Sequence, residues 1–232
     1  MPLPTHNISS SQSEPVPAWR ERPAHMSPAT WRAAKLISLL SNPMVISLPC
    51  FALVTMKATP RLQERLRWWG IATAAMSLTP LVHIRWGVHT GRISDHEVSV
   101  RKERLWPYMV ELGAVGCSYL AMRTLKAPRL MTGLVLSVAT GMVIITGVTL
   151  FWKMSMHVSV ASGTVMLVVL LYGKAWIPLF LFVPAVGWSR YILDHHSVAQ
   201  AAAGAVIGAL VPVVVFRAMR LTTIAAQDSF SG

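Results

Sequence analysis

Seven mainly apolar stretches alternate with short polar segments along the chain. Each stretch is close to the roughly 20 residues that an α-helix needs to cross the hydrocarbon core of a bilayer. The least regular is 175–192, which contains Pro178 and Pro184, although prolines are tolerated in membrane helices whose neighbours satisfy the freed carbonyls. The pattern predicts an all-α, polytopic bundle of six to seven transmembrane helices, at approximately 36–56, 69–86, 107–123, 129–151, 156–173, 175–192 and 197–216.

The polar ends of the chain lack a hydrophobic period. Residues 1–33 carry Ser, Pro, Gln and Glu and are expected to form a flexible polar tail, without the basic start and short apolar core of a cleavable signal. Residues 34–220 are expected to form one membrane-embedded domain, and 221–232 a polar C-terminal tail. Within the last stretch, Gly204 and Gly208 form a small-xxx-small face suited to close helix packing.

Composition and charge narrow the classes of protein. Hydrophobic residues make up 53% and charged residues only 13%, against roughly 25% charged in a soluble domain, so the chain has no room for a sizeable soluble domain. The net charge of +12 does not indicate a nucleic-acid partner, because the Lys and Arg residues are scattered between apolar stretches. Anionic lipid headgroups or a phosphate-bearing substrate explain the basicity better.

Three polar clusters follow the second, fourth and sixth apolar stretches, so an even number of crossings places all three on one face of the membrane. Charged and polar groups at the ends of membrane helices are costly, and their convergence indicates a functional site. The only long polar connection, about 87–106, holds the first cluster. The clusters consist of Arg101, Lys102 and Arg104, then Lys153, Ser155 and His157, then Ser189 to His196.

These clusters resemble the signature of the type 2 phosphatidic acid phosphatase superfamily over about residues 69–216. The third family motif is Ser-Arg, five residues, His, three residues, Asp, and SRYILDHHSVAQ matches it with Ser189, Arg190 and His196 but has Gln200 at the last position. The second motif, Pro-Ser-Gly-His, is reduced to a Ser and a His in MSMH, residues 154–157. The first, Lys, six residues, Arg-Pro, is weakest, because RKERLWPY is preceded by Glu97 where Lys would stand.

The resemblance implies a metal-independent mechanism without a cofactor. His196 would attack phosphorus to give a phosphohistidine, and His157 would be the general acid that protonates the leaving oxygen. Gln200 would orient His196 in place of the usual Asp. A Gln at this position is familiar in the dolichyl-diphosphatase-like branch, so the resemblance favours polyprenyl phosphates as the substrate. The phosphate would be bound by positively charged and hydroxyl side chains that stabilise its equatorial oxygens, namely Arg190, Ser155, Arg104, Lys102, Arg101 and Ser189.

Other interpretations of these residues stay open at this point. The basic residues of 101–104 are also typical of a solvated loop that reads lipid charge, and Arg190 of a side chain that snorkels to headgroups. Glu111 and Asp194 are expected in structural ion pairs. His195 and His196 are adjacent, and a pair of metal ligands on one helix face would need i, i+4 spacing. The remaining histidines, His83, His89 and His96, are expected at the membrane interface.

The sequence therefore predicts an integral membrane phosphatase that hydrolyses a phosphomonoester or diphosphate on a lipid, either a polyprenyl or a phosphatidate-like one. The alternative is a non-catalytic lipid-binding or transport protein that retains the fold, and a haem or metal protein using His157 and His196 is a third. Outside the proposed site, fewer Lys and Arg lie on the face of the three clusters than on the opposite face. The positive-inside rule therefore places the site on the extracytoplasmic side of the cell membrane.

Overall fold

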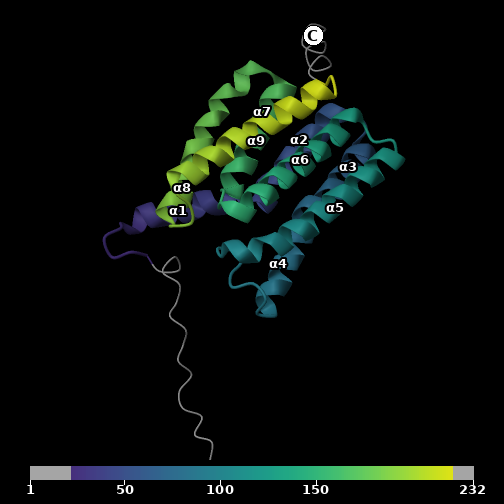
Figure 1. Ribbon diagram of the computed structural model, residues 1–232. Coiled ribbons are helices and arrows are strands. Elements are labelled where there is room, and N and C mark those ends of the chain that lie inside the picture. The colour runs from purple at the N-terminus through teal and green to yellow at the C-terminus, as the bar shows by residue number, and fades with distance from the viewer. Residues whose placement is uncertain (1–21, 222–232) are drawn as a thin grey trace, which may run out of the picture.

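The computed structural model describes residues 22–221, and every regular element among them is a helix (Figure 1). The predicted all-α class is therefore confirmed for this part of the chain, whereas residues 1–21 and 222–232 of the two expected tails lie outside the described residues. In chain order the elements are α1 (Pro28–Leu40), α2 (Pro43–Ala58), α3 (Leu62–Thr73), the π-helical turn η2 (Ala74–Leu78), α4 (Thr79–His89), the 3-10 turn η3 (Arg101–Arg104), α5 (Leu105–Thr124), α6 (Arg129–Phe151), α7 (Met156–Tyr172), the 3-10 segment η4 (Lys174–Leu181), α8 (Phe182–Ile192) and α9 (Val198–Ala218).

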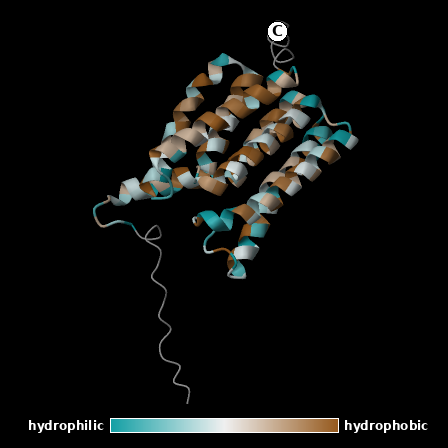
Figure 2. Ribbon diagram, viewed as in Figure 1, coloured by the Kyte–Doolittle hydropathy of each residue, from teal (hydrophilic) through white to brown (hydrophobic). Residues whose placement is uncertain are grey.

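Several helices have the length and composition of membrane spans. Among the described residues there are three such candidates: α6, then the combined segment of η4 and α8 (Lys174–Ile192), then α9. Helices α1 and α2 form a fourth if the 50° bend between them lies within one span. Figure 2 shows apolar residues along these helices and polar residues gathered at helix ends and loops. The arrangement fits a membrane protein, and the count of six to seven spans stays a prediction.

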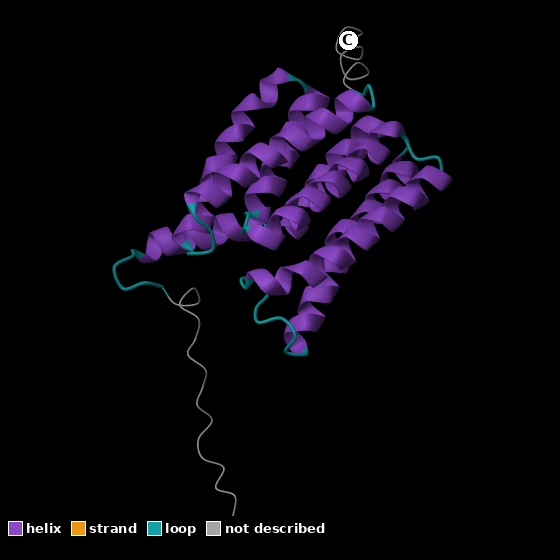
Figure 3. Ribbon diagram, viewed as in Figure 1, coloured by secondary structure: helices purple, strands orange, loops and turns teal. Residues whose placement is uncertain are grey.

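Figure 3 shows the described residues as helices joined by loops. Two of the predicted stretches are each divided between helical elements. The stretch 36–56 is divided because Asn42 caps α2, its Oδ1 accepting the N–H of Met44 at 3.0 Å, and Pro43 follows as the first helical residue. Helix α1 also begins earlier than the expected boundary at residue 34, since Ser27 caps it. The turn η2 precedes Pro80, which has no N–H to donate and crowds the preceding turn.

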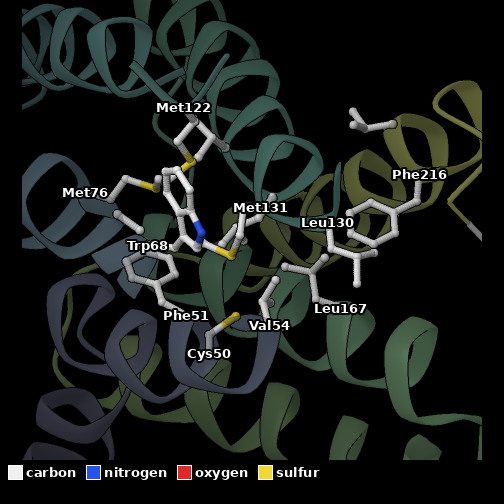
Figure 4. Packing of buried hydrophobic residues seen from close by; sticks show 14 of the residues in the cluster. Cys50, Phe51, Val54, Trp68, Met76, Met122, Leu130, Met131, Leu167 and Phe216 are labelled. Atoms are coloured by element: carbon white, nitrogen blue, oxygen red, sulfur yellow. The ribbon is translucent and has the colours of Figure 1, made fainter. Parts of the chain in front are cut away.

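The main hydrophobic core lies between α2, α3, α5, α6, α7 and α9 (Figure 4). Trp68 of α3 is buried with Met122 of α5 and Met131 of α6, and Phe51 of α2 belongs to the same cluster. Because these helices are far apart in the sequence, the cluster fixes their mutual positions and the loops that they carry.

Helices α7 and α9 pack with little space between their backbones, as the glycine spacing predicts. A Cβ atom on Gly204 would lie 2.7 Å from the carbonyl oxygen of Ser155, and one on Gly208 would overlap the carbonyl oxygen of Ser159. A further bond links the pair, from Ser162 Oγ to the carbonyl oxygen of Ala205 at 2.7 Å. Close packing here holds the start of α7 beside the start of α9.

Candidate active site

The connection from α8 to α9 carries one of the expected site residues, His196. Asp194 adopts a left-handed backbone conformation with φ 56°, which Asp tolerates better than most residues. The chain therefore folds back, and the N–H groups of His195 and His196 both donate to the carbonyl oxygen of Arg190, at 3.0 and 3.2 Å. This tight turn holds His196 beside the end of α8.

Helix α9 begins with a capping box that also involves His196. Ser197 Oγ accepts the N–H of Gln200, and Gln200 Oε1 accepts the N–H of Ser197 at 3.2 Å. The same Oε1 lies 3.1 Å from Nδ1 of His196. With its proton on Nδ1, the imidazole donates to this oxygen and its Nε2 keeps a free lone pair.

The start of α7 brings His157 to the same region. Ser155 caps this helix, its Oγ accepting the N–H of Val158 at 3.5 Å, while its own N–H donates to the carbonyl oxygen of Gln200 at 3.3 Å. His157 is the second residue of α7 and is 8% exposed. Contact between the starts of α7 and α9 thus places both histidines at one end of the helix pair.

The loop between α4 and η3 contributes Glu97, the acid that stands where the resembled first motif has Lys. Buried Asp95 accepts the N–H groups of Glu97 and Ser99, at 2.8 and 3.1 Å, so the loop is folded on this carboxylate. Arg104 Nε donates to the carbonyl oxygen of Val98 at 2.8 Å and holds the loop to the start of α5. The side chain of Glu97 points to Arg190, with Oε2 2.9 Å from Nη2.

Arg190 is almost fully buried, at 1% exposure, and is held from two sides. On one side, Nη1 donates to Ser38 Oγ of α1 at 2.6 Å, and on the other, Nη2 forms the ion pair with Glu97. Ser189 donates to the carbonyl oxygen of Ala34 at 2.7 Å and ties α8 to α1. A guanidinium fixed in this way is well placed to bind an anion, because its conformational freedom is already lost.

The charged groups face a cavity of about 190 Å³ that reaches into the helix bundle. Its polar end is lined by Glu97, Arg104, His157, Arg190 and His196, and its remainder is largely apolar. The apolar wall comes from α2, η2, α4, α5, α6, α7 and α9, with residues that include Phe51, Leu134, Leu167 and Val211. A cavity charged at one end and apolar along its length is suited to an amphiphile.

Not all expected site residues reach the cavity. The structure brings together Arg190, Arg104, His157 and His196, with Gln200 behind His196. Ser155 and Ser189 make the helix contacts described above and do not line it. Arg101 Nη1 instead donates to the carbonyl oxygens of Thr149 and Leu150 at the end of α6, and exposed Lys102 lines a separate small pocket with Trp106.

The structure also places residues at the cavity that sequence reasoning assigned elsewhere. His96, expected at the interface, and Glu111, expected in an ion pair, both line it. Ser38 lies within an apolar stretch, and nothing in its neighbourhood in the sequence indicates a contact with Arg190. The Glu97 position was visible in the sequence as an acid where the resembled motif has Lys.

The two adjacent histidines are buried in a positive environment. Burial, followed by the charges of Arg104 and Arg190, lowers the pKa of His196 to about 2, and burial with the charge of Arg190 lowers the pKa of His195 to about 3. Both imidazoles are therefore neutral at physiological pH. For His196 neutrality matters chemically, because only an unprotonated Nε2 is a nucleophile.

Comparisons with known proteins add no assignment. The chain matches no protein-family model, no curated protein and no solved structure. Among residues 22–221, no three His, Cys, Asp or Glu side chains gather as ligands for a metal ion. The interpretation of the site therefore rests on its own geometry.

Proposed function

We propose that the protein is a multi-pass membrane phosphatase of the type 2 phosphatidic acid phosphatase kind, acting on a phosphomonoester or diphosphate of a lipid. The observation that carries this proposal is the convergence of His196, His157, Arg190 and Arg104 on the polar end of an otherwise apolar cavity. The apolar remainder of the cavity offers a place for the hydrocarbon chain, so polyprenyl phosphates and phosphatidate are both candidate substrates.

The proposed reaction has two steps. In the first, Nε2 of His196 forms a bond to phosphorus, the bond from phosphorus to the leaving oxygen breaks, and His157 supplies a proton to that oxygen. In the second, water attacks the phosphohistidine, His157 takes up a proton from the water, and phosphate leaves while His196 is restored. The guanidinium groups of Arg190 and Arg104 stabilise the equatorial oxygens in both steps.

The same proposal includes six to seven membrane spans and a site on the extracytoplasmic face. Placement of all three polar clusters on one face requires α7 and the segment containing α5 to cross the bilayer, and α7 is apolar although it has only 17 residues. The distribution of Lys and Arg supports the orientation through the positive-inside rule.

One observation favours a second candidate, a lipid-binding or transport protein without catalysis. Glu97 pairs with Arg190 at 2.9 Å, so an acid stands where the resembled motif supplies a cation to the phosphate. Such a protein would bind the lipid phosphate and release no phosphate from it.

Phosphate release from purified protein in detergent separates the two candidates. The substrates are polyprenyl diphosphate, polyprenyl phosphate and phosphatidate, each tested with excess EDTA. We expect release from at least one substrate, acid-labile phosphate trapped on the wild-type chain, and loss of both in His196→Ala. The matched control is His89→Ala, an exposed histidine at the end of α4, which should keep full activity. Comparable turnover in His196→Ala would overturn the phosphohistidine mechanism, and lipid binding without release would favour the second candidate.

A further inference from the structure

Three buried polar atoms at the cavity have no hydrogen-bond partner among the described residues: Arg190 Nε, His157 Nε2 and Glu97 Oε2. All three residues line its polar end. Glu97 Oε2 lies 2.9 Å from Arg190 Nη2 as an ion pair and 3.7 Å from His157 Nε2. Unsatisfied buried polar atoms are costly and uncommon, so Arg190 Nε and His157 Nε2, which face one cavity, indicate a bound polar ligand. Glu97 Oε2 lies beside them as an acceptor whose one close partner is Nη2 of the ion pair.

The hydrogen-bonding capacity of these atoms restricts that ligand. Arg190 Nε only donates, His157 Nε2 donates when it carries the ring proton, and the carboxylate of Glu97 only accepts. A fully deprotonated phosphate has only acceptors, so it matches the two donors but is repelled by the carboxylate. A carboxylate oxygen can accept a second hydrogen bond, and a phosphate that keeps one P–OH group donates it, so this phosphate matches all three atoms.

The backbone of the loop at Glu97 is held in place. The carboxylate of Asp95 accepts the N–H of Glu97 at 2.8 Å and the hydroxyl of Ser99 at 3.2 Å. Arg104 Nε donates to the carbonyl oxygen of Val98. The charged and titratable groups around the site come from several elements: Arg190 of α8, Arg104 of η3, His157 of α7, His196 and Lys153 of the loops, and His96 and Asp95 of its own loop. The carboxylate of Glu97 is therefore a negative acceptor within an otherwise mainly cationic site.

We infer that Glu97 is a specificity-determining residue that selects a singly protonated terminal phosphate, whose P–OH donates to Oε2 while its other oxygens accept from Arg190 and His157. The inference rests on the proposed phosphate site and assigns one residue to its selectivity for the protonation state of the phosphate. A phosphomonoester, or the terminal phosphate of a diphosphate, carries the required P–OH. A phosphodiester has none and is excluded.

Inorganic phosphate and sulfate test this directly, because both are tetrahedral but only phosphate carries a proton at about pH 6. Titration calorimetry with the full chain in detergent should give at least roughly tenfold tighter binding of phosphate than of sulfate, the size expected for one charge-assisted hydrogen bond. In Glu97→Gln the amide N–H donates to either anion, so the preference should fall to less than about threefold.

Two controls make the result decisive. Glu64→Gln changes the same residue type in α3, outside the cavity lining, and should keep the wild-type preference. Wild-type protein should also bind phosphate and reject dimethyl phosphate, a comparison that does not depend on any variant folding. Equal binding of phosphate and sulfate by the wild type, binding of neither, or an unchanged preference in Glu97→Gln would each overturn the inference. Selective phosphate binding without turnover would reject the proposed phosphatase alone, whereas turnover without selectivity would reject the role of Glu97 alone.

Discussion

Gln200 Oε1 lies 3.1 Å from Nδ1 of His196 and also accepts the N–H of Ser197 at 3.2 Å. One side chain therefore closes the capping box of α9 and orients the imidazole that lines the cavity. In the resembled family an Asp usually accepts this proton, and a neutral amide keeps the orientation while giving less stabilisation to a developing imidazolium. The proposed catalytic role of His196 is thus tied to the first turn of α9.

Replacing Gln200 with Leu should lower turnover by roughly one to three orders of magnitude, by analogy with the orienting residues of catalytic triads. The imidazole loses the acceptor that fixes its tautomer, so Nε2 is no longer held ready to attack. Turnover on the best lipid phosphate of the panel measures the effect, with the apparent Tm recorded in the same detergent. Ser197→Ala is the matched control, because it removes the other half of the capping box and leaves the contact with His196. Equal turnover of Gln200→Leu and wild type would make Gln200 a capping residue only.

Stability should fall as pH is lowered from about 6.5, the usual pKa of an unfolded histidine. Burial and the neighbouring guanidinium groups lower the pKa of His195 and His196 to about 3 and about 2 in the folded protein. Below about 6.5 the unfolded chain therefore binds protons that the folded protein does not, and unfolding is favoured. Apparent Tm values between about pH 7 and pH 5 check the sign. Replacement of His195 by Gln should flatten the dependence, and a Tm that rises with acidity would contradict it.

An added methyl group between α7 and α9 should destabilise the protein and weaken the site. A Cβ on Gly208 overlaps the carbonyl oxygen of Ser159, so Gly208→Ala requires backbone movement and should cost about 1–3 kcal/mol or more. Because these helices carry His157 and His196, turnover should fall with the Tm. Gly147→Ala is the control: it lies in α6 outside the cavity lining, a Cβ there meets nothing within 4 Å, and Ala favours a helix. Equal Tm values for the two variants would contradict the close packing.

Turnover should survive excess EDTA, because Arg190 and Arg104 supply the positive charge at the proposed phosphate position. The assay compares rates before and after chelation, with magnesium added back to a second sample. Loss of activity that magnesium restores would reject this account and direct attention to Asp95, Glu97 and Asp194 as ligands. Arg190→Lys tests whether the guanidinium itself supplies this charge in the right geometry, because a single ammonium cannot reproduce the contacts to Ser38 and Glu97 together.

The sequence by itself determined the helical class and most of the element positions. The stretches 129–151, 156–173 and 197–216 correspond closely to α6, α7 and α9, because a long apolar run has few alternatives to a helix. The resemblance carried by SRYILDHHSVAQ also implied a contact between His196 and Gln200, and Gln200 Oε1 lies 3.1 Å from Nδ1 of His196. The two residues are four apart and lie together at the start of a helix. Such local relationships need no knowledge of the rest of the chain.

Only the tertiary structure decided which distant groups share the cavity. Arg101, Lys102 and Arg104 are neighbours in the sequence, yet Arg104 alone lines the cavity, because the turn η3 directs Arg101 to the end of α6 and leaves Lys102 exposed. Ser38 and Glu97 reach Arg190 through the packing of α1 on α8 and the fold of the loop around Asp95. Hydropathy records how apolar a segment is and carries no record of which face meets which neighbour. That choice is made by side-chain packing between helices, and with it the balance of donors and acceptors at the site.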